Sequence, residues 1–253
     1  MCTAVLSFEP GRQLLLLAGL RDEFTDRLWD PPGRHWPDHP DLIGGRDRQA
    51  GGTWLAVWPD RRRVSCVLNG TGEAAPLRTR RSRGGLPLRA AAGEPLDRAA
   101  LADTDPFRLL TADPGQVTLQ CWDGRDLTER RLPAGLHLVV NSGLAGDLAA
   151  PGRPHELRRI AHFRGRFAAA EVPEPRPGQA AADAWGSWLP LVNGDGIGPS
   201  DERALIVRRE LAGGRTWGTT SISLVALAPG WLRYDFTADP GNAAAWYPVS
   251  PST

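Results

Sequence analysis

Apolar residues at the start of the chain fall into two runs separated by a short polar turn. The first run covers residues 2–8 and the second covers 13–20, with Glu-Pro-Gly-Arg at 9–12 between them. Proline and glycine are typical of turns, so the pattern predicts an antiparallel hairpin. The second run is almost wholly apolar, which indicates a strand buried on both faces.

The rest of the chain alternates between strand-like and helix-like segments. A second hairpin is predicted over residues 51–70, and Asn69 ends its second strand. Short apolar runs predict further strands at residues 107–112, 117–122, 136–141, 204–210, 219–226 and 231–236. Helices are expected at residues 86–92, 95–102, 154–170 and 184–192. The Pro- and Trp-rich segment 29–45 has no periodicity and is predicted to be an ordered surface loop.

The longest predicted helix, 154–170, has an apolar side made of Leu157, Ile160, Ala161 and Phe167. Strands precede and follow the helices, and the chain has neither an internal repeat nor a long linker. We therefore expect a single α+β domain over residues 1–253 that contains stacked sheets.

Composition narrows the classes of function. The chain has 253 residues, is 41% hydrophobic and carries a formal net charge of +1, so it can bury a core and has no global field for nucleic acid or an anionic membrane. Its basic residues are arginines, a usage we attribute to a GC-rich bacterial genome, and the cluster at 61–63 is interpreted as a solvated turn. The apolar run ending at Leu20 is too short to span a bilayer.

Three widely spaced cysteines form neither a disulfide framework nor a metal cluster. Cys66 and Cys121 lie in apolar runs and are interpreted as buried thiols. The start of the chain lacks the basic segment of a signal peptide. We therefore expect a cytoplasmic protein without a membrane span.

Cys2 admits two interpretations. It is either a small apolar residue that starts a strand or, after removal of Met1, an N-terminal residue whose α-amine serves its own thiol as a base. The predicted hairpin brings Arg21 and Asp22, expected just past the second strand, close to Cys2.

Two asparagines extend this candidate site. Asn69 and Asn141 each follow an apolar strand, where a site at a sheet edge places its polar groups. Their side-chain amides can donate to a tetrahedral oxyanion. Arg21 and Asp22 would orient the amine and lower the thiol pKa. Each asparagine alone is more commonly a turn residue.

Several of these motifs together resemble the NRDE family, which includes the transport and Golgi organisation proteins. The resemblance is carried by the stretches MCTAVLSF, LLLLAGLRDEF, GGTWLAVW, VLNG, VVNS and WGTTSISLVAL. The family resembles N-terminal nucleophile hydrolases, which implies a four-layer αββα sandwich of two mostly antiparallel sheets. The same resemblance to cysteine-type acylases implies that Cys2 is nucleophile and base, that Asp22 binds the amine, and that Asn69 and Asn141 shape the oxyanion hole.

The chain departs from the family pattern at three positions. Leu20 stands where the NRDE tetrad has its asparagine, Thr220 replaces the arginine of a Gly-Thr-Arg motif, and Gly70 follows Asn69 where relatives have a bulkier residue. Arg215 is the candidate to replace the missing guanidinium. The resemblance thus implies an amidohydrolase or acyltransferase acting on a small amide or thioester, without a required cofactor.

The alternative is a non-catalytic protein that binds or traffics haem, or lipid and acyl-CoA, as the family resemblance also implies. Tryptophans such as Trp29, Trp36, Trp54 and Trp58 would line an apolar pocket, although core packing explains them as well. The pair His35 and His39 is interpreted as exposed, because prolines prevent the helix that would align two histidines on a metal. A scaffold role is the third hypothesis, and no sequence feature argues for it.

Overall fold

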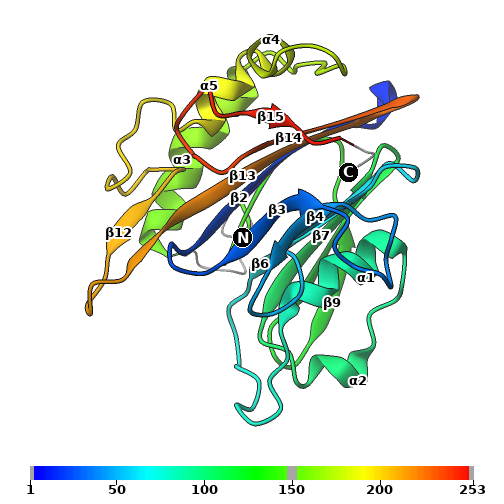
Figure 1. Cartoon of the computed structure of the whole chain (residues 1–253), viewed down its shortest axis with the longest axis vertical. Coiled ribbons are helices and arrows are strands. Elements are labelled where there is room, and N and C mark those ends of the chain that lie inside the picture. Colours follow the sequence, from blue (N-terminus) through cyan, green and yellow to red (C-terminus); the bar gives the residue numbers. More distant parts are fainter. Residues whose placement is uncertain (1–2, 147–152, 251–253) are drawn as a thin grey trace.

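The computed structural model describes residues 3–146 and 153–250. Its larger sheet has eight strands, in the spatial order β11-β10-β1-β2-β13-β14-β15, with β12 paired to one end of β13 (Figure 1). These strands are β1 (Thr3–Glu9), β2 (Leu14–Phe24), β10 (Gly135–Val140), β11 (Gly143–Leu144), β12 (Arg208–Glu210), β13 (Thr216–Ala228), β14 (Trp231–Thr237) and β15 (Tyr247–Pro248).

A smaller sheet of five strands follows the chain order. It consists of β5 (Leu55–Trp58), β6 (Arg63–Asn69), β7 (Phe107–Asp113), β8 (Gln116–Trp122) and β9 (Leu127–Arg131). A separate ribbon pairs β3 (Trp29–Gly33) with β4 (Gly44–Asp47). All strand pairs among the described residues are antiparallel, apart from an isolated parallel bridge between Arg81 and Thr104.

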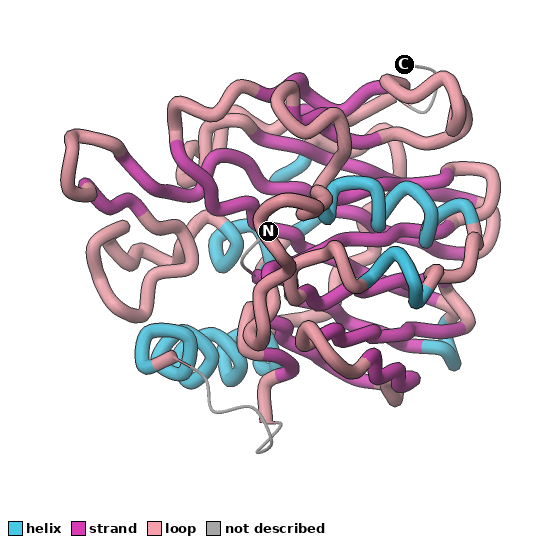
Figure 2. The backbone as a smooth tube through the Cα atoms, turned by 90° about the horizontal axis from the view of Figure 1, so that it is seen from below, coloured by secondary structure: helices cyan, strands magenta, loops and turns pink. Residues whose placement is uncertain are grey.

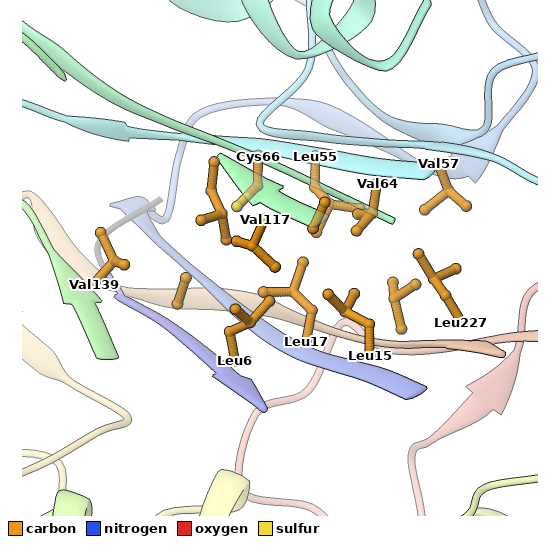
Figure 3. Close-up of a cluster of buried hydrophobic side chains, with 14 of the residues drawn as sticks. Leu6, Leu15, Leu17, Leu55, Val57, Val64, Cys66, Val117, Val139 and Leu227 are labelled. Atoms are coloured by element: carbon orange, nitrogen blue, oxygen red, sulfur yellow. The ribbon is translucent and has the colours of Figure 1, made fainter. Parts of the chain in front are cut away.

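The main apolar cluster lies between the two sheets. Leu15 and Leu17 of β2 face Leu55 of β5 and Cys66 of β6, as Figure 3 shows, and all four side chains are fully buried. Because side chains alternate along a strand, Leu14 and Leu16 of β2 point to the other face. The prediction that this apolar run is buried on both faces is therefore confirmed.

Helices cover the outer faces of both sheets (Figures 1 and 2). The second apolar cluster joins the large sheet to α3 (Pro154–Ala169), α4 (Ala181–Trp185) and α5 (Trp188–Val192). Two smaller clusters join the small sheet to α1 (Leu86–Ala92) and α2 (Arg98–Leu101). The expectation of an α+β chain with mostly antiparallel sheets is confirmed. None of the described helices is long and apolar enough to cross a bilayer.

Several element predictions need correction. Strand β2 runs four residues past Leu20, so Arg21 and Asp22 lie inside it and not beyond its end. The extension exists because β13 continues to pair with β2 as far as Phe24. Strand prediction missed this pairing because charged residues interrupt the apolar run.

Three other segments differ from their predictions. The stretch 29–45 contains the ribbon β3–β4, whose prolines fall at an irregularity between Asp30 and Gly33, where a ladder bond is not required. Strand β9 went unpredicted because it is an exposed edge strand, LTERR, without apolar alternation. The predicted strand at 204–210 contracts to β12.

The buried side of α3 also differs from the expected one. Glu156, Arg159, Phe163 and Phe167 are buried, whereas Leu157 is 52% exposed. The helix therefore presents two charged side chains to the large sheet, at the end nearer its N-terminus. Apolar periodicity does not predict the burial of these two charged side chains.

A buried ion pair fastens the segment between α3 and α4 to the large sheet. Arg233 Nη2 donates to Asp235 Oδ1 at 3.1 Å, and the same guanidinium donates to the carbonyls of Arg176 and Gln179 at 2.6 and 2.9 Å. Trp185 Nε1 donates to Asp235 Oδ2 at 2.7 Å. The guanidinium of Arg233 and the carboxylate of Asp235 thus both have hydrogen-bond partners within the protein, which indicates a structural role.

We predict that Asp235→Asn destabilises the protein by about 3–5 kcal/mol, because it leaves a buried guanidinium without its anion. Urea denaturation measures the change. Glu73→Gln is the matched control, since its pair with Arg125 has side chains 60% and 77% exposed and should contribute little to stability. Equal stability losses in the two variants would contradict the prediction.

Candidate functional site

The first described residue, Thr3, lies beside an interior position of β2 and beside the last residue of β10. It pairs with Leu20 of β2 and with Val140 of β10, so Arg21 and Asn141 are the next residues along those two chains. Cys2 lies outside the described residues.

Three adjoining cavities open at this edge of the sheets. The first, here called the strand-end cavity, has a volume of about 290 Å³ and is lined by Asp22, Asn69, Asn141, Arg153, His155, Glu156, Arg159, Val207, Arg209 and Trp217. The second, of about 380 Å³, shares Asp22 and Asn69 with it and adds Arg21 and Trp54. The third, of about 410 Å³, shares Asn69, Asn141 and Arg153 with the first.

The structure therefore brings together the described residues of the predicted site. Asp22, Asn69 and Asn141 line one cavity although they come from β2, the end of β6 and the residue after β10. Arg21 lines the neighbouring cavity, with Asp22 and Asn69.

Asp22 is held by β13. Its side chain is 4% exposed, and its Oδ1 accepts a hydrogen bond of 2.7 Å from Thr219 Oγ1. Thr219 Oγ1 in turn accepts from the backbone N–H of Val207 at 2.9 Å. The pairing of β2 and β13 shifts register between Thr219 and Ser221, which sets Thr220 apart from the regular ladder.

Arg159 of α3 was not among the predicted site residues. Its side chain is 6% exposed and its Nη1 lies 4.0 Å from Asp22 Oδ2. It donates from Nη1 to Thr3 Oγ1 at 2.7 Å and from Nε to the carbonyl of Ala204 at 2.8 Å. One buried guanidinium thus ties the start of β1 to the helix layer and lies next to the Asp22 carboxylate.

Arg21 occupies the opposite side of β2. Its Nη1 donates to Thr220 Oγ1 at 2.8 Å, its Nη2 lies 3.5 Å from Asp47 Oδ2, and its guanidinium stacks 4.5 Å from the centre of the Trp54 ring. Burial lowers the pKa of Arg21, and Asp47 and Glu23 act in the opposite direction. Thr220, which stands where the family motif has arginine, is therefore a hydrogen-bond acceptor for Arg21.

Arg215 does not take the place of that missing arginine. Its guanidinium donates twice to the exposed carboxylate of Asp26, at 2.9 and 3.0 Å. Arg159, from a helix, is instead the guanidinium that lies beside Asp22. The suggestion from sequence that Arg215 serves this purpose is wrong.

The two asparagines lie at strand ends, as predicted. Asn69 is the last residue of β6. A Cβ on Gly70 would lie 2.5 Å from the backbone N of Phe107, so a bulkier residue cannot follow Asn69 here without moving the backbone. The Oδ1 atom of Asn141 is buried and has no hydrogen-bond partner among the described residues. This oxygen is an acceptor, so it is available to a hydrogen-bond donor.

Glu156 links α3 to the segment that follows β10. It is 2% exposed and accepts a short hydrogen bond from Ser142 Oγ. Glu156 and Arg159 share a helical stripe with Phe163 and Phe167, at spacings of three and four residues. This spacing was the available sequence signal, and it was missed because charged residues were assigned to the solvent side.

Of the four tryptophans in the binding hypothesis, one lines a cavity described above. Trp54 lines the second cavity, and Trp29 packs edge-to-face on Trp54 and Phe236. Trp36 and Trp58 pack beside the small apolar cluster near α1.

The two loop histidines are partly buried. His35 Nε2 lies 2.8 Å from the carbonyl oxygen of Pro31, and His39 Nδ1 lies 4.0 Å from Glu94 Oε1. In the described part of the chain, no group of three or more His, Cys, Asp or Glu side chains could hold a metal ion.

Comparison with known proteins identifies the family. The family model described as Transport and Golgi organisation 2 matches residues 1–170, well over half of the chain. The chain therefore belongs to this family, which confirms the resemblance inferred from its motifs. The matched range includes β1, β2, Asn69, Asn141 and Arg159. No curated protein matches the chain.

We predict that Arg159→Met destabilises the protein by about 3 kcal/mol, because Thr3 Oγ1 and the Ala204 carbonyl lose a buried donor at about 1–3 kcal/mol each. Urea denaturation gives the change in stability, and amide hydrogen exchange should become faster in β1. Arg158→Met is the matched control, because Arg158 pairs with Glu202 at an exposed position. If both variants had the same stability, Arg159 would not anchor β1.

Proposed function

We propose that this member of the Transport and Golgi organisation 2 family is a cysteine amidohydrolase or acyltransferase acting on a small amide or thioester. In this proposal Met1 is removed and Cys2 is the nucleophile. The supporting observation is that Asp22, Asn69 and Asn141 line one cavity at the end of the sheet where β1 begins. Thr3, the neighbour of Cys2, is anchored there by Arg159.

The architecture supports the same assignment. Two antiparallel sheets pack through a shared apolar cluster, and helices cover their outer faces. This order of layers is the one that the resemblance to N-terminal nucleophile hydrolases implies. In that fold the nucleophile is the first residue of a strand, which here would be β1.

The proposed reaction begins at the thiol. The free α-amine of Cys2 takes the thiol proton, and the thiolate sulfur attacks the carbonyl carbon of the substrate. The C–N or C–S bond to the leaving group then breaks, and the ammonium returns its proton to that group. Water or an acceptor amine attacks the resulting thioester, which releases the acyl group and restores the thiol.

The surrounding residues would serve this sequence in distinct ways. The Asp22 carboxylate, fixed by Thr219, would hold the α-ammonium in place. The side-chain amides of Asn69 and Asn141 would donate to the oxyanion, and one such donor is worth about a 10²–10³-fold change in rate. Arg21, the next residue of β2 after the partner of Thr3, would favour the thiolate as a nearby cation.

We predict that iodoacetamide labels Cys2 rapidly, with an apparent pKa below the usual value of about 8.5. Intact mass and peptide mapping measure the labelling over a range of pH and also show whether Met1 is absent. The thiol of Cys121 is partly exposed, so the Cys121→Ser variant is used to prevent labelling at that position. Cys66 is an internal control, because burial raises the pKa of its thiol to about 12. Retention of Met1 would exclude the mechanism, and binding of haem or a lipid would then be the better hypothesis.

We also predict that Cys2→Ala abolishes turnover of short-chain acyl p-nitroanilides and acyl thioesters, with an unchanged unfolding midpoint. Cys66→Ala is unsuitable as a control because it opens a core cavity, so Cys121→Ser is used and should retain full activity. Asn141→Asp should lower kcat by about 10²–10³-fold, because it replaces an oxyanion donor by an anion. Normal activity in Cys2→Ala would contradict the proposed function.

A further inference from the structure

The edge of the sheets that carries the candidate site concentrates positive charge. The three adjoining cavities are lined by eight arginines and five carboxylates, whereas the whole chain has a net charge of +1. In the second cavity the carboxylates of Glu23, Asp47 and Asp105 pair with arginines. The strand-end cavity is lined by three further arginines, Arg153, Arg159 and Arg209.

The two carboxylates of the strand-end cavity are already engaged. Asp22 accepts from Thr219 Oγ1 at 2.7 Å, and Glu156 accepts from Ser142 Oγ. Both are buried, at 5% and 2% exposed. One oxygen of each carboxylate therefore accepts from a hydroxyl of the protein.

The three arginines of this cavity differ in their partners, since the side chain of Arg159 is held by other described residues and those of Arg153 and Arg209 are not. Arg159, 5% exposed, hydrogen-bonds to a hydroxyl and a carbonyl, and its closest carboxylate is 4.0 Å away. The side chains of Arg153 and Arg209 form no ion pair or hydrogen bond within residues 3–146 and 153–250. Both are exposed at the cavity mouth, one before α3 and one on β12.

The pKa of His155, which lines the cavity, is affected by the neighbouring arginines. Burial lowers its pKa, and Arg209, Arg159 and Arg153 lower it further, while Glu156 acts in the opposite direction. Neutral donors are also present, because the amides of Asn69 and Asn141 line the same space. A volume of about 290 Å³ is at the lower end of the range of about 300–1,000 Å³ for small-molecule sites.

We infer that the strand-end cavity binds an oxyanion, a carboxylate or a phosphate, carried by the substrate, with Arg153 and Arg209 as its recognition residues and Arg159 behind them. That the anion belongs to a substrate rests on the proposed function. Anion binding itself requires no catalysis. A guanidinium is suited to either group, because its planar donors match two oxygens at once. The reactive carbonyl would then lie toward Asn69 and Asn141, and the charged group toward α3 and β12.

Binding is tested on the full chain carrying Cys2→Ala, which cannot turn over substrate in the proposed mechanism. Inorganic phosphate and acetate are titrated separately at constant ionic strength, and NMR follows the side-chain amides of Asn69 and Asn141. Arg153→Ala and Arg209→Ala should each raise the Kd of the preferred anion at least fivefold. Arg208→Ala is the matched control, because it removes the same charge from an exposed position on β12. Arg208 does not line the cavity.

The preferred probe identifies the substrate group: tighter binding of phosphate indicates a phosphate-bearing substrate, and tighter binding of acetate a carboxylate-bearing one. Absence of saturable shifts at Asn69 and Asn141 for both anions would overturn the inference. Equal weakening by Arg208→Ala and Arg209→Ala would overturn it too, since the effect would then be unspecific screening.

A turnover measurement separates this inference from the proposed function. Wild-type protein is assayed with succinyl and butyryl p-nitroanilide, which have similar length and differ in a terminal carboxylate. Turnover that favours the succinyl compound, and loses that preference in Arg209→Ala, supports both proposals. Saturable anion binding without turnover of either compound leaves the oxyanion site standing and removes the hydrolase. Equal turnover of both compounds without anion binding supports the hydrolase and overturns the oxyanion site.

Discussion

The double burial of β2 is the constraint on which the remaining structure depends. Residues 14–20 are apolar at nearly every position, with one set of side chains packed on the small sheet and the alternate set on α3–α5. Because β1 and β13 flank this strand, three segments distant in sequence meet along it. An apolar run alone would tolerate a slip in register. The polar end of the strand does not, since Asp22 must reach Thr219 and Arg21 must reach Thr220.

The same alternation separates two cations at the candidate site. Arg21 lies on the side of Trp54, and Arg159 approaches from the helix layer beside Asp22. The departures from the family pattern become intelligible in these terms. Leu20 is fully buried in the cluster shared with the helices, where an asparagine would need a partner for its amide. Thr220 is short enough to accept from Arg21, and a guanidinium beside Asp22 comes from α3.

Periodicity predicted the elements whose stability comes from apolar burial. Strand β1, the hairpin β5–β6 and helix α1 were found close to their observed bounds, because their apolar residues face the core. The positions of Asn69 and Asn141 at strand ends were also predicted from the apolar runs that precede them. Arg159 and Thr219 could not be predicted in this way. Their burial depends on pairing between segments well over a hundred residues apart, which no local pattern contains.

Two buried guanidinium groups show how structure and function can be told apart in this protein. Arg233 donates to Asp235 and to two carbonyls, and borders none of the three cavities, so its network is complete without a ligand. Arg159 is as deeply buried, yet its carboxylate lies 4.0 Å away and it borders a cavity. Apolar residues of similar volume commonly stabilise a fold as well as buried ions do. A stripe of α3 that carries Glu156 and Arg159 where apolar residues would pack is therefore better explained by chemistry at the strand-end cavity than by stability alone.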